Sequence, residues 1–184
     1  MACRREVNRR GGIVYARRMP PPTLTDAIQD YVREIYKLSV DGDRVTTTAL
    51  ARRQRVSAAS ASAMVKKLAA LGLVEHAPYR GVVLTDDGSR VALEVIRHHR
   101  LLELYLAETL GIDVDDVHAE ADKLEHVLSE ELEARIDQAL GYPTHDPHGD
   151  PIPTPELEWP PEEGAQASRA RKTSARVRGA PPAA

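Results

Sequence analysis

The stretch 46–84 constrains the fold of this chain more than any other part of the sequence. A short run of helix-forming residues leads through a brief turn to Ser57, a residue type that caps helix N-termini well, and the helix that begins there ends at Gly72. Two strand-like runs follow, 73–76 and 82–85, joined by a tip that contains proline and glycine. Two helices, a brief turn between them and a two-stranded hairpin are the elements of a winged helix-turn-helix, in that order.

Helical periodicity continues on both sides of this stretch. Residues 25–38 place their apolar side chains on one face of a helix. After the hairpin we expect a long helix over 86–110 and a further helix over about 114–140, with a break near His118 as a possibility. Phe is absent and aromatic residues make up 4% of the chain, so leucine, valine, isoleucine and alanine must build the core. We therefore predict a mainly α protein.

The predicted organisation has four parts. Residues 1–22 are a flexible basic extension, interpreted either as an arm that touches DNA phosphates or as translation from too early a start, with Met19 as the true first residue; the second is favoured because nothing here is arranged to pack. Residues 23–93 are the winged helix-turn-helix, and residues 94–153 are a helical domain. Residues 154–184 are rich in proline, alanine and arginine and are expected to be a disordered tail.

Charge is divided unevenly between these parts. The stretch 45–74 has five basic residues and no acidic one, whereas 101–158 has sixteen acidic residues and two basic ones. The division suits a protein with a nucleic-acid face and a separate cation-binding part, although two ordinary solvated surfaces would also show it.

Cysteine content and hydropathy indicate the compartment. Cys3 is the only cysteine, which excludes disulfide frameworks and Cys-rich zinc sites and favours a reducing cytoplasm. No apolar run approaches the roughly 18 residues of a membrane span, and the basic N-terminus lacks a signal-peptide core. We expect a cytoplasmic protein with no membrane partner.

The second helix of the pair is the one expected to enter the major groove of DNA. Its N-terminal part has small side chains, so it can approach closely; serine hydroxyls can bond base edges or phosphates, and alanine methyls can touch thymine methyls. An alanine-rich packing helix is the alternative, but the basic run and the arginine at the hairpin tip argue against it. The predicted DNA-binding residues are Thr48, Ser57, Ala59, Ser60, Ser62, Ala63, Lys66 and Arg80.

Two acidic helices carry ligand-type side chains at helical spacing, so that those of each helix lie on one face. Helices that each present carboxylate and imidazole groups can build a divalent-metal site, whereas a lone His–Glu pair is usually a surface ion pair. Oxygen and imidazole ligands without thiolate suit Mn²⁺ or Fe²⁺ better than Cu⁺ or structural zinc. The residues are His99 and Glu103 on the first helix, and His118, Asp122, Glu125 and His126 on the second.

Six segments in this order and spacing resemble a known family, the diphtheria-toxin-repressor and manganese-transport-regulator repressors, over about 25–153. The segments are DYVREIY (30–36), LGLV (71–74), LTDDG (84–88), HHRLLE (98–103), LEHVLS (124–129) and PHGDPIP (147–153).

The resemblance implies a homodimer that binds a palindromic operator in double-stranded DNA when loaded with metal. Asp30 and Asp122 are carboxylates where the iron-responsive branch has methionine and cysteine, as in the manganese branch. The resemblance also implies that Asp30 joins Asp122, Glu125 and His126 around one ion, and that His99, Glu103 and His118 hold a second ion.

Two departures from the family pattern bear on the number of ions. The manganese branch has a glutamate where this chain has Arg33, which puts its closely spaced two-metal site in doubt. Many actinobacterial-type members continue into an SH3-like third domain that can lend ligands to the second site. This chain has a polar tail instead, so we expect no such domain and a weak or open second site.

We therefore predict a Mn²⁺-dependent repressor of metal-uptake genes, in which the ion bridges the DNA-binding and dimerisation halves. An Fe²⁺-dependent repressor and a metal-independent dimeric regulator are the alternatives. A metallohydrolase would need a general base in a cleft and a substrate pocket, and neither signature is found, so no enzyme is predicted. Of the remaining ligand-type residues, we interpret His145, Asp146, His148 and Asp150 as part of a capped Pro/Gly turn, and His76 and His98 as solvated.

Overall fold

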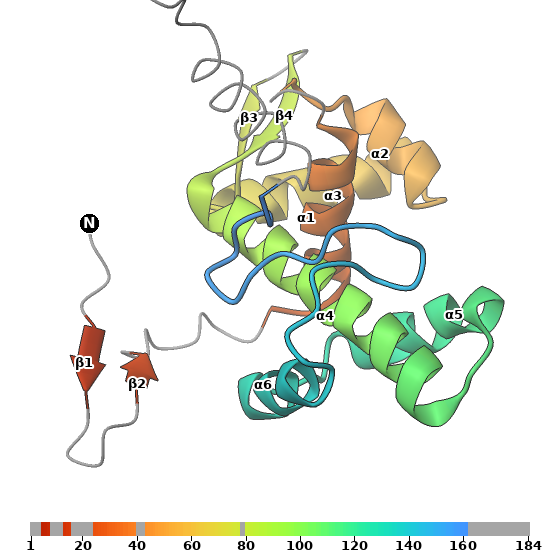
Figure 1. Ribbon diagram of the computed structural model, residues 1–184. Coiled ribbons are helices and arrows are strands. Elements are labelled where there is room, and N and C mark those ends of the chain that lie inside the picture. The colour runs from red at the N-terminus through yellow and green to blue at the C-terminus, as the bar shows by residue number, and fades with distance from the viewer. Residues whose placement is uncertain (1–4, 8–12, 16–23, 40–42, 78–79, 162–184) are drawn as a thin grey trace, which may run out of the picture.

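The computed structural model describes residues 5–7, 13–15, 24–39, 43–77 and 80–161. Within these ranges the chain forms six helices and two two-stranded antiparallel sheets (Figure 1). The elements are β1 (Arg5–Val7), β2 (Ile13–Tyr15), α1 (Asp26–Leu38), α2 (Thr47–Arg53), α3 (Ala58–Ala70), β3 (Val74–Ala77), β4 (Gly81–Leu84), α4 (Asp86–Leu110), α5 (Val114–Leu124) and α6 (Glu130–Ala139).

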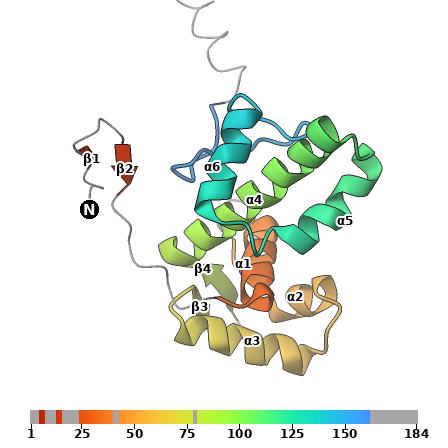
Figure 2. The same ribbon diagram turned by 90° about the horizontal axis from the view of Figure 1, so that it is seen from below.

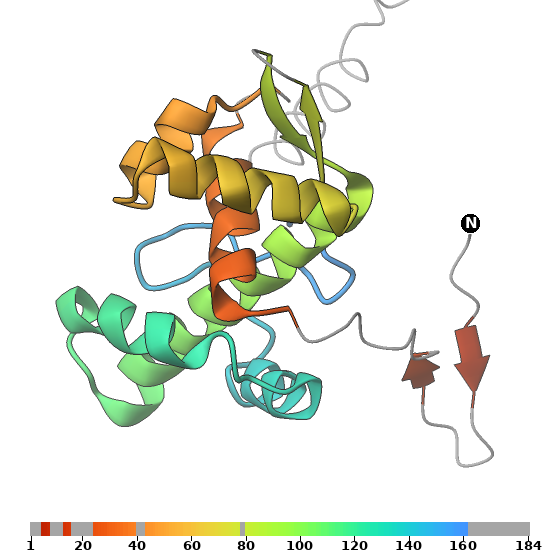
Figure 3. The same ribbon diagram turned by 180° about the vertical axis from the view of Figure 1, so that it is seen from behind.

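The first three helices and the β3–β4 hairpin form the predicted winged helix-turn-helix. The Thr46 hydroxyl accepts from the backbone N–H of Ala49 at the start of α2, and the Ser57 hydroxyl accepts from Ser60 at the start of α3. Between the two helices the backbone takes a left-handed conformation at Arg55, with φ 53°. Figure 3 shows α3 lying across α1, with the hairpin at one end of α3. Leucine, valine and isoleucine side chains fill this core, as the composition predicts.

Helix α4 joins this unit to the rest of the molecule. It packs against α1 on one side and against α5 and α6 in the rest of the molecule (Figure 2). The second core is aliphatic, with Leu101, Val117 and Ile152 almost fully buried. The expected boundary between residues 93 and 94 falls inside α4, so the two halves share one continuous helix.

The helix expected over 114–140 is two helices. α5 runs through His118 without a break and ends at Leu124, and α6 begins at Glu130. The Ser129 hydroxyl accepts from the backbone N–H of Leu132, so a new N-cap forms where the periodicity indicated a helix interior. This break places Glu125 and His126 just beyond α5.

The two ends of the chain also differ from expectation. The strands β1 and β2, each of three residues, pair within the N-terminal range in which no element was predicted; the rest of 1–23 lies outside the described residues. Residues 154–161, expected to be disordered, form a turn in which the Thr154 N–H donates to the Glu158 carbonyl. The remainder of the predicted tail, 162–184, lies outside the described residues.

No helix in the described ranges combines the length and the apolar character needed to cross a bilayer.

Candidate metal centre

Helix α1, the second half of α4, and α5 with the turn that follows it bring together all seven predicted ligand residues. His99 and Glu103 lie one turn apart on α4, and both are buried. The Glu125 side chain is completely buried, whereas the His118 side chain is 60% exposed. The site therefore has a closed side against α4 and an open side along α5.

The first group of ligand-type atoms joins the two halves of the molecule. Asp30 on α1, with Glu125 and His126 after α5, places its ligand atoms within 4.8 Å of one another. The Asp30 carboxylate lies 3.2 Å from His126 Nε2, which is 3.3 Å from a Glu125 oxygen. Burial raises the pKa of Asp30, although the charges of Arg33 and His126 oppose this shift.

The second group lies between α4 and α5. His99, His118 and Asp122 place their ligand atoms within 4.8 Å of one another, and Glu103 is close by, 3.1 Å from His99 Nε2 and 2.9 Å from His118 Nδ1. His99 also connects this group to the first, because its Nδ1 lies 2.7 Å from a Glu125 oxygen.

Asp122 lies between the two predicted sets. The resemblance implied that it joins Asp30 around one ion, but its carboxylate faces His99 Nδ1 at 3.5 Å and His118 Nε2 at 3.7 Å. Between Asp122 and Asp30 stands the guanidinium of Arg33, 3.3 Å from each carboxylate. The same guanidinium forms an ion pair with Glu125.

Opposite charges dominate the electrostatics of the second group. Burial lowers the pKa of His99, but hydrogen bonds to Glu103 and Glu125 outweigh it and raise that pKa to about 9. Burial raises the pKa of Glu103, but hydrogen bonds to His99 and His118 outweigh it and lower that pKa to about 2. At neutral pH the His99 imidazole is therefore positively charged, with a proton on each ring nitrogen. A metal ion that binds His99 would have to replace one of these protons.

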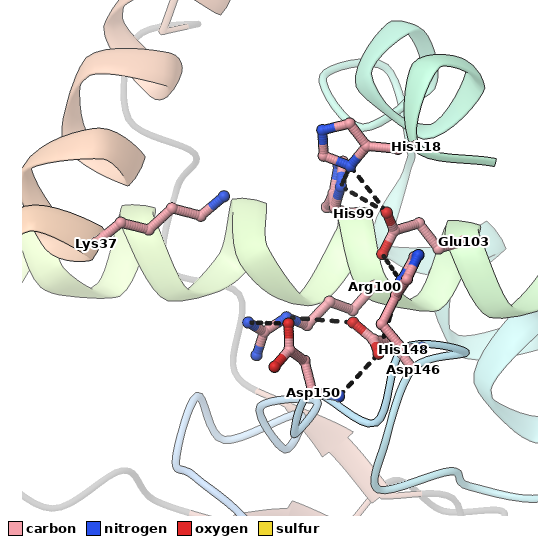
Figure 4. A pocket seen from close by; sticks show the side chains of 8 residues that line it. All are labelled: Lys37, His99, Arg100, Glu103, His118, Asp146, His148 and Asp150. Carbon is pink, nitrogen blue, oxygen red and sulfur yellow. Dashed lines mark hydrogen bonds and ion pairs between the residues drawn. The ribbon is translucent and has the colours of Figure 1, made fainter. Parts of the chain in front are cut away.

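A third group was not predicted as a site. Glu103, Asp146 and His148 place ligand atoms within 4.8 Å of one another beside a pocket of about 230 Å³ (Figure 4). The capping interpretation of Asp146 holds, because its carboxylate accepts from the backbone N–H groups of His148 and Asp150, both at 2.9 Å. The alternation of ligand-type side chains in the segment 145–150 could have indicated this group from the sequence. The packing of that segment against α4 could not be predicted in this way.

His98 is a correction of a different kind. It was expected to be solvated, but it is buried, with Nδ1 3.1 Å from the Glu125 carbonyl and Nε2 3.1 Å from Glu133. His98 is buried because α6 covers the face of α4 on which this residue lies. His76 is exposed, as expected.

The donor atoms of the first two groups fit a divalent metal ion. Carboxylate oxygens and imidazole nitrogens converge from three elements, and no sulfur lies among them, which is the donor chemistry of Mn²⁺ and Fe²⁺. Asp30, Glu125 and His126 would hold an ion between the halves; His99, His118, Asp122 and Glu103 would hold one between α4 and α5.

The predicted DNA-binding residues lie apart from these groups, on the outer face of α2 and α3 and on the hairpin tip. Every one of them is exposed. The Ser57 and Ser60 hydroxyls lie 2.8 Å apart at the start of α3, so each has a partner on the helix itself. Arg53 pairs with the buried Glu34 at 2.6 Å, yet its side chain is exposed, as are Arg52 and Arg55.

Comparison with known proteins divides the chain between residues 82 and 85, before the start of α4. Residues 23–82 match the iron dependent repressor N-terminal DNA binding domain, and residues 85–154 match the iron dependent repressor metal binding and dimerisation domain. The iron-dependent repressor IdeR of Mycobacterium tuberculosis is 38% identical over 143 residues, which are 77% of this chain and 62% of IdeR. The diphtheria toxin repressor of Corynebacterium diphtheriae is 36% identical over 130 residues, 71% of this chain and 58% of that protein.

Solved structures extend the comparison. A manganese-dependent transcriptional repressor in complex with manganese is 47% identical, with a TM-score of 0.67 over 74% of this chain and 63% of that one. ScaR with bound Zn²⁺ is 34% identical, with a TM-score of 0.64 over the same shares. The chain thus spans about three fifths of the length of these relatives.

Proposed function

This chain belongs to the iron-dependent repressor family, and from that premise we propose that it is a homodimeric, metal-dependent transcriptional repressor. The observation that carries the proposal is the first group of ligand atoms. Asp30 comes from the DNA-binding half, whereas Glu125 and His126 come from the metal-binding half, and their atoms converge within 4.8 Å. One ion bound there holds the two halves in one relative placement.

Linkage turns that placement into a switch. If the ion favours the placement in which α3 fits the major groove, metal strengthens DNA binding by its differential affinity for that placement. DNA strengthens metal binding by the same factor, because the coupling is reciprocal. The repressor then binds its operator when metal is plentiful and releases it when metal is scarce.

Mn²⁺ is the ion that we propose. Asp30 and Asp122 are carboxylates where the iron-responsive branch of the family has methionine and cysteine, and they add hard oxygen ligands. No thiolate or thioether lies among the described ligand groups. Fe²⁺ is the alternative, because relatives include iron-dependent repressors as well as a manganese-dependent one.

A homodimer is supported by the surface of the metal-binding half. Leu110, Leu124, Val127 and Leu132 are large apolar side chains that are 40–74% exposed around α5 and α6. Large contiguous apolar surfaces are typical of protein interfaces, and we propose that these side chains contribute to one. A second copy covering them would present two α3 helices to the two halves of a palindromic operator.

The first prediction concerns metal-dependent DNA binding. Full-length protein is titrated onto a fluorescent duplex of its own promoter, or of a manganese-transporter promoter, with Mn²⁺, with Fe²⁺ under anaerobic conditions, and after chelation. We expect Mn²⁺ to tighten operator binding by about 10- to 100-fold, the usual range of allosteric coupling. Operator affinity that is unchanged by chelation would reject metal control, and a larger effect of Fe²⁺ would reject manganese.

A pair of variants on α1 connects this effect to the site. D30N removes a ligand-type carboxylate, and we expect it to abolish most of the metal effect. D26N is the matched control, because Asp26 is exposed in the first turn of the same helix. An unchanged metal effect in D30N would contradict an ion that bridges the two halves through Asp30.

A further inference from the structure

We infer that Arg33 is a tethered cation that competes with the metal ion: its guanidinium pairs with the carboxylates of the candidate metal centre and must leave them when an ion binds. The inference rests on the proposed function, because it concerns the same site. It assigns a role to a residue that stands among the ligand groups but can donate no lone pair to a metal.

The contacts of Arg33 connect the two halves. One terminal nitrogen contacts Glu125 and lies 3.3 Å from Asp122, and the other lies 3.3 Å from Asp30. Glu125 and Asp122 belong to the metal-binding half, and Asp30 is one turn before Arg33 on α1. The guanidinium therefore neutralises carboxylates of both halves, as a bridging ion would, and ties α1 to the end of α5.

Comparison with a second buried arginine shows that this arrangement is incomplete. Arg97 on α4 has a partner for each guanidinium nitrogen: Glu133, the Pro153 carbonyl at 2.6 Å and Asp137 at 2.8 Å. Arg33 leaves its Nε buried without a hydrogen-bond partner among the described residues. A buried donor without a partner disfavours the arrangement, so the Arg33 contacts are easier to give up than those of Arg97.

The guanidinium and an ion exclude each other for two reasons. Both need the carboxylate oxygens of Asp30 and Glu125. A guanidinium also stays protonated at any pH at which a protein folds, so Arg33 cannot lose its charge to accommodate a divalent cation a few ångströms away. The free energy needed to move Arg33 out lowers the affinity of the site for metal. A higher metal concentration is therefore needed to load the site than if Arg33 were uncharged.

Calorimetric titration of Mn²⁺ into the full chain tests the inference through binding rather than through DNA. R33Q removes the charge, and we expect Mn²⁺ to bind this variant at least about tenfold more tightly than wild type, a change of about 1.4 kcal/mol. R135Q is the matched control, because Arg135 pairs with Glu131 on the exposed face of α6, and its Mn²⁺ affinity should equal that of wild type.

The outcomes separate the two proposals. Equal or weaker Mn²⁺ binding by R33Q, with wild type still binding, overturns the role of Arg33 and leaves the metal centre standing. No Mn²⁺ binding by either protein overturns the proposed manganese dependence itself.

A second measurement covers the case in which R33Q does not fold. In a crystal structure of the wild-type chain grown with Mn²⁺, we expect the Arg33 guanidinium away from an ion held by Asp30 and Glu125. An ion at those residues with Arg33 still paired to Glu125 overturns the inference.

Discussion

At the scale of single residues, the buried ionic groups of α4 have two distinct roles. His99 and Glu103 face the candidate metal centre, where their neighbours are other ligand-type groups. Arg97 and His98 face α6, where Glu133 pairs with both of them. Neighbouring positions on one helix thus serve the site and the packing of α6 respectively, because successive residues point about 100° apart.

The role of Arg97 and His98 in packing against α6 should appear in the pH dependence of stability, through their partner Glu133. Burial raises the pKa of Glu133, but its hydrogen bond with His98 and the charges of His98 and Arg97 outweigh burial and lower that pKa. A folded-state pKa below the unfolded one means that the contribution is full above the unfolded pKa and is lost as pH falls through the folded one. We expect E133Q to reduce the free energy of unfolding by about 2 kcal/mol at pH 7.

Urea unfolding in the presence of a chelator, at pH 7 and at acid pH, checks this prediction. The difference between E133Q and wild type should shrink as pH falls from the unfolded-state pKa of glutamate, about 4.3, through the lowered folded-state pKa of Glu133. E131Q is the control, since Glu131 is 78% exposed, and it should stay within about 0.5 kcal/mol of wild type. A difference between E133Q and wild type that stays constant with pH would contradict the assignment.

At the scale of elements, the close approach of α4 to the start of the hairpin sets how the two halves meet. Gly88 lies in the first turn of α4, where its N–H donates to the Thr85 cap at 3.1 Å. A Cβ at this position would lie 1.9 Å from the Leu73 carbonyl oxygen. Only glycine therefore lets α4 start against the turn that ends α3.

Replacing this glycine should separate the two elements. We expect G88A to lower the free energy of unfolding by about 3 kcal/mol, because backbone on both sides must shift. G72A is the comparison, since Gly72 has φ +75° but open space around its Cβ position. It should cost about 1–2 kcal/mol, from the left-handed conformation alone. If urea unfolding shows equal losses of stability in G88A and G72A, the close approach of α4 to the Leu73 carbonyl is not what makes glycine necessary at position 88.

At the scale of the whole molecule, segment 141–161 returns from α6 along α4 to α1 (Figure 1). At its end the Trp159 indole N–H donates to the Tyr36 hydroxyl on α1 at 3.0 Å. The Arg100 guanidinium on α4 lies 5.5 Å from the centre of the same ring. Trp159 thus contacts both halves.

Loss of this contact should weaken the connection between the halves. We expect W159A to lower the free energy of unfolding by about 1–2 kcal/mol, because the ring is 40% exposed and part of its area is already in water. W159F keeps a ring over Arg100 but loses the hydrogen bond to Tyr36, and it should lie between W159A and wild type. Thermal unfolding followed by circular dichroism measures all three, and a W159A midpoint equal to that of wild type would contradict the connection.

Local patterns were enough to predict much of the fold and the candidate ligands. The cap at Ser57, the turn between α2 and α3, and the apolar face of α1 depend on residues close in sequence. The one-turn spacing of His99 and Glu103 likewise depends on the helix alone. For these features the sequence alone was sufficient, because the interactions that produce them span a few residues.

Tertiary structure decided how those pieces combine at the metal centre. The position of Arg33 among the carboxylates depends on residues 89 and 92 positions away, and the burial of His98 depends on α6. Helix α5 ends at Leu124, although the helical periodicity of the sequence continues past this residue. The end of the helix turns Glu125 toward both Arg33 and His99. Side-chain spacing identifies which residues share a face, but only packing between distant elements determines which charges meet, and here that packing places an arginine where a metal ion was expected.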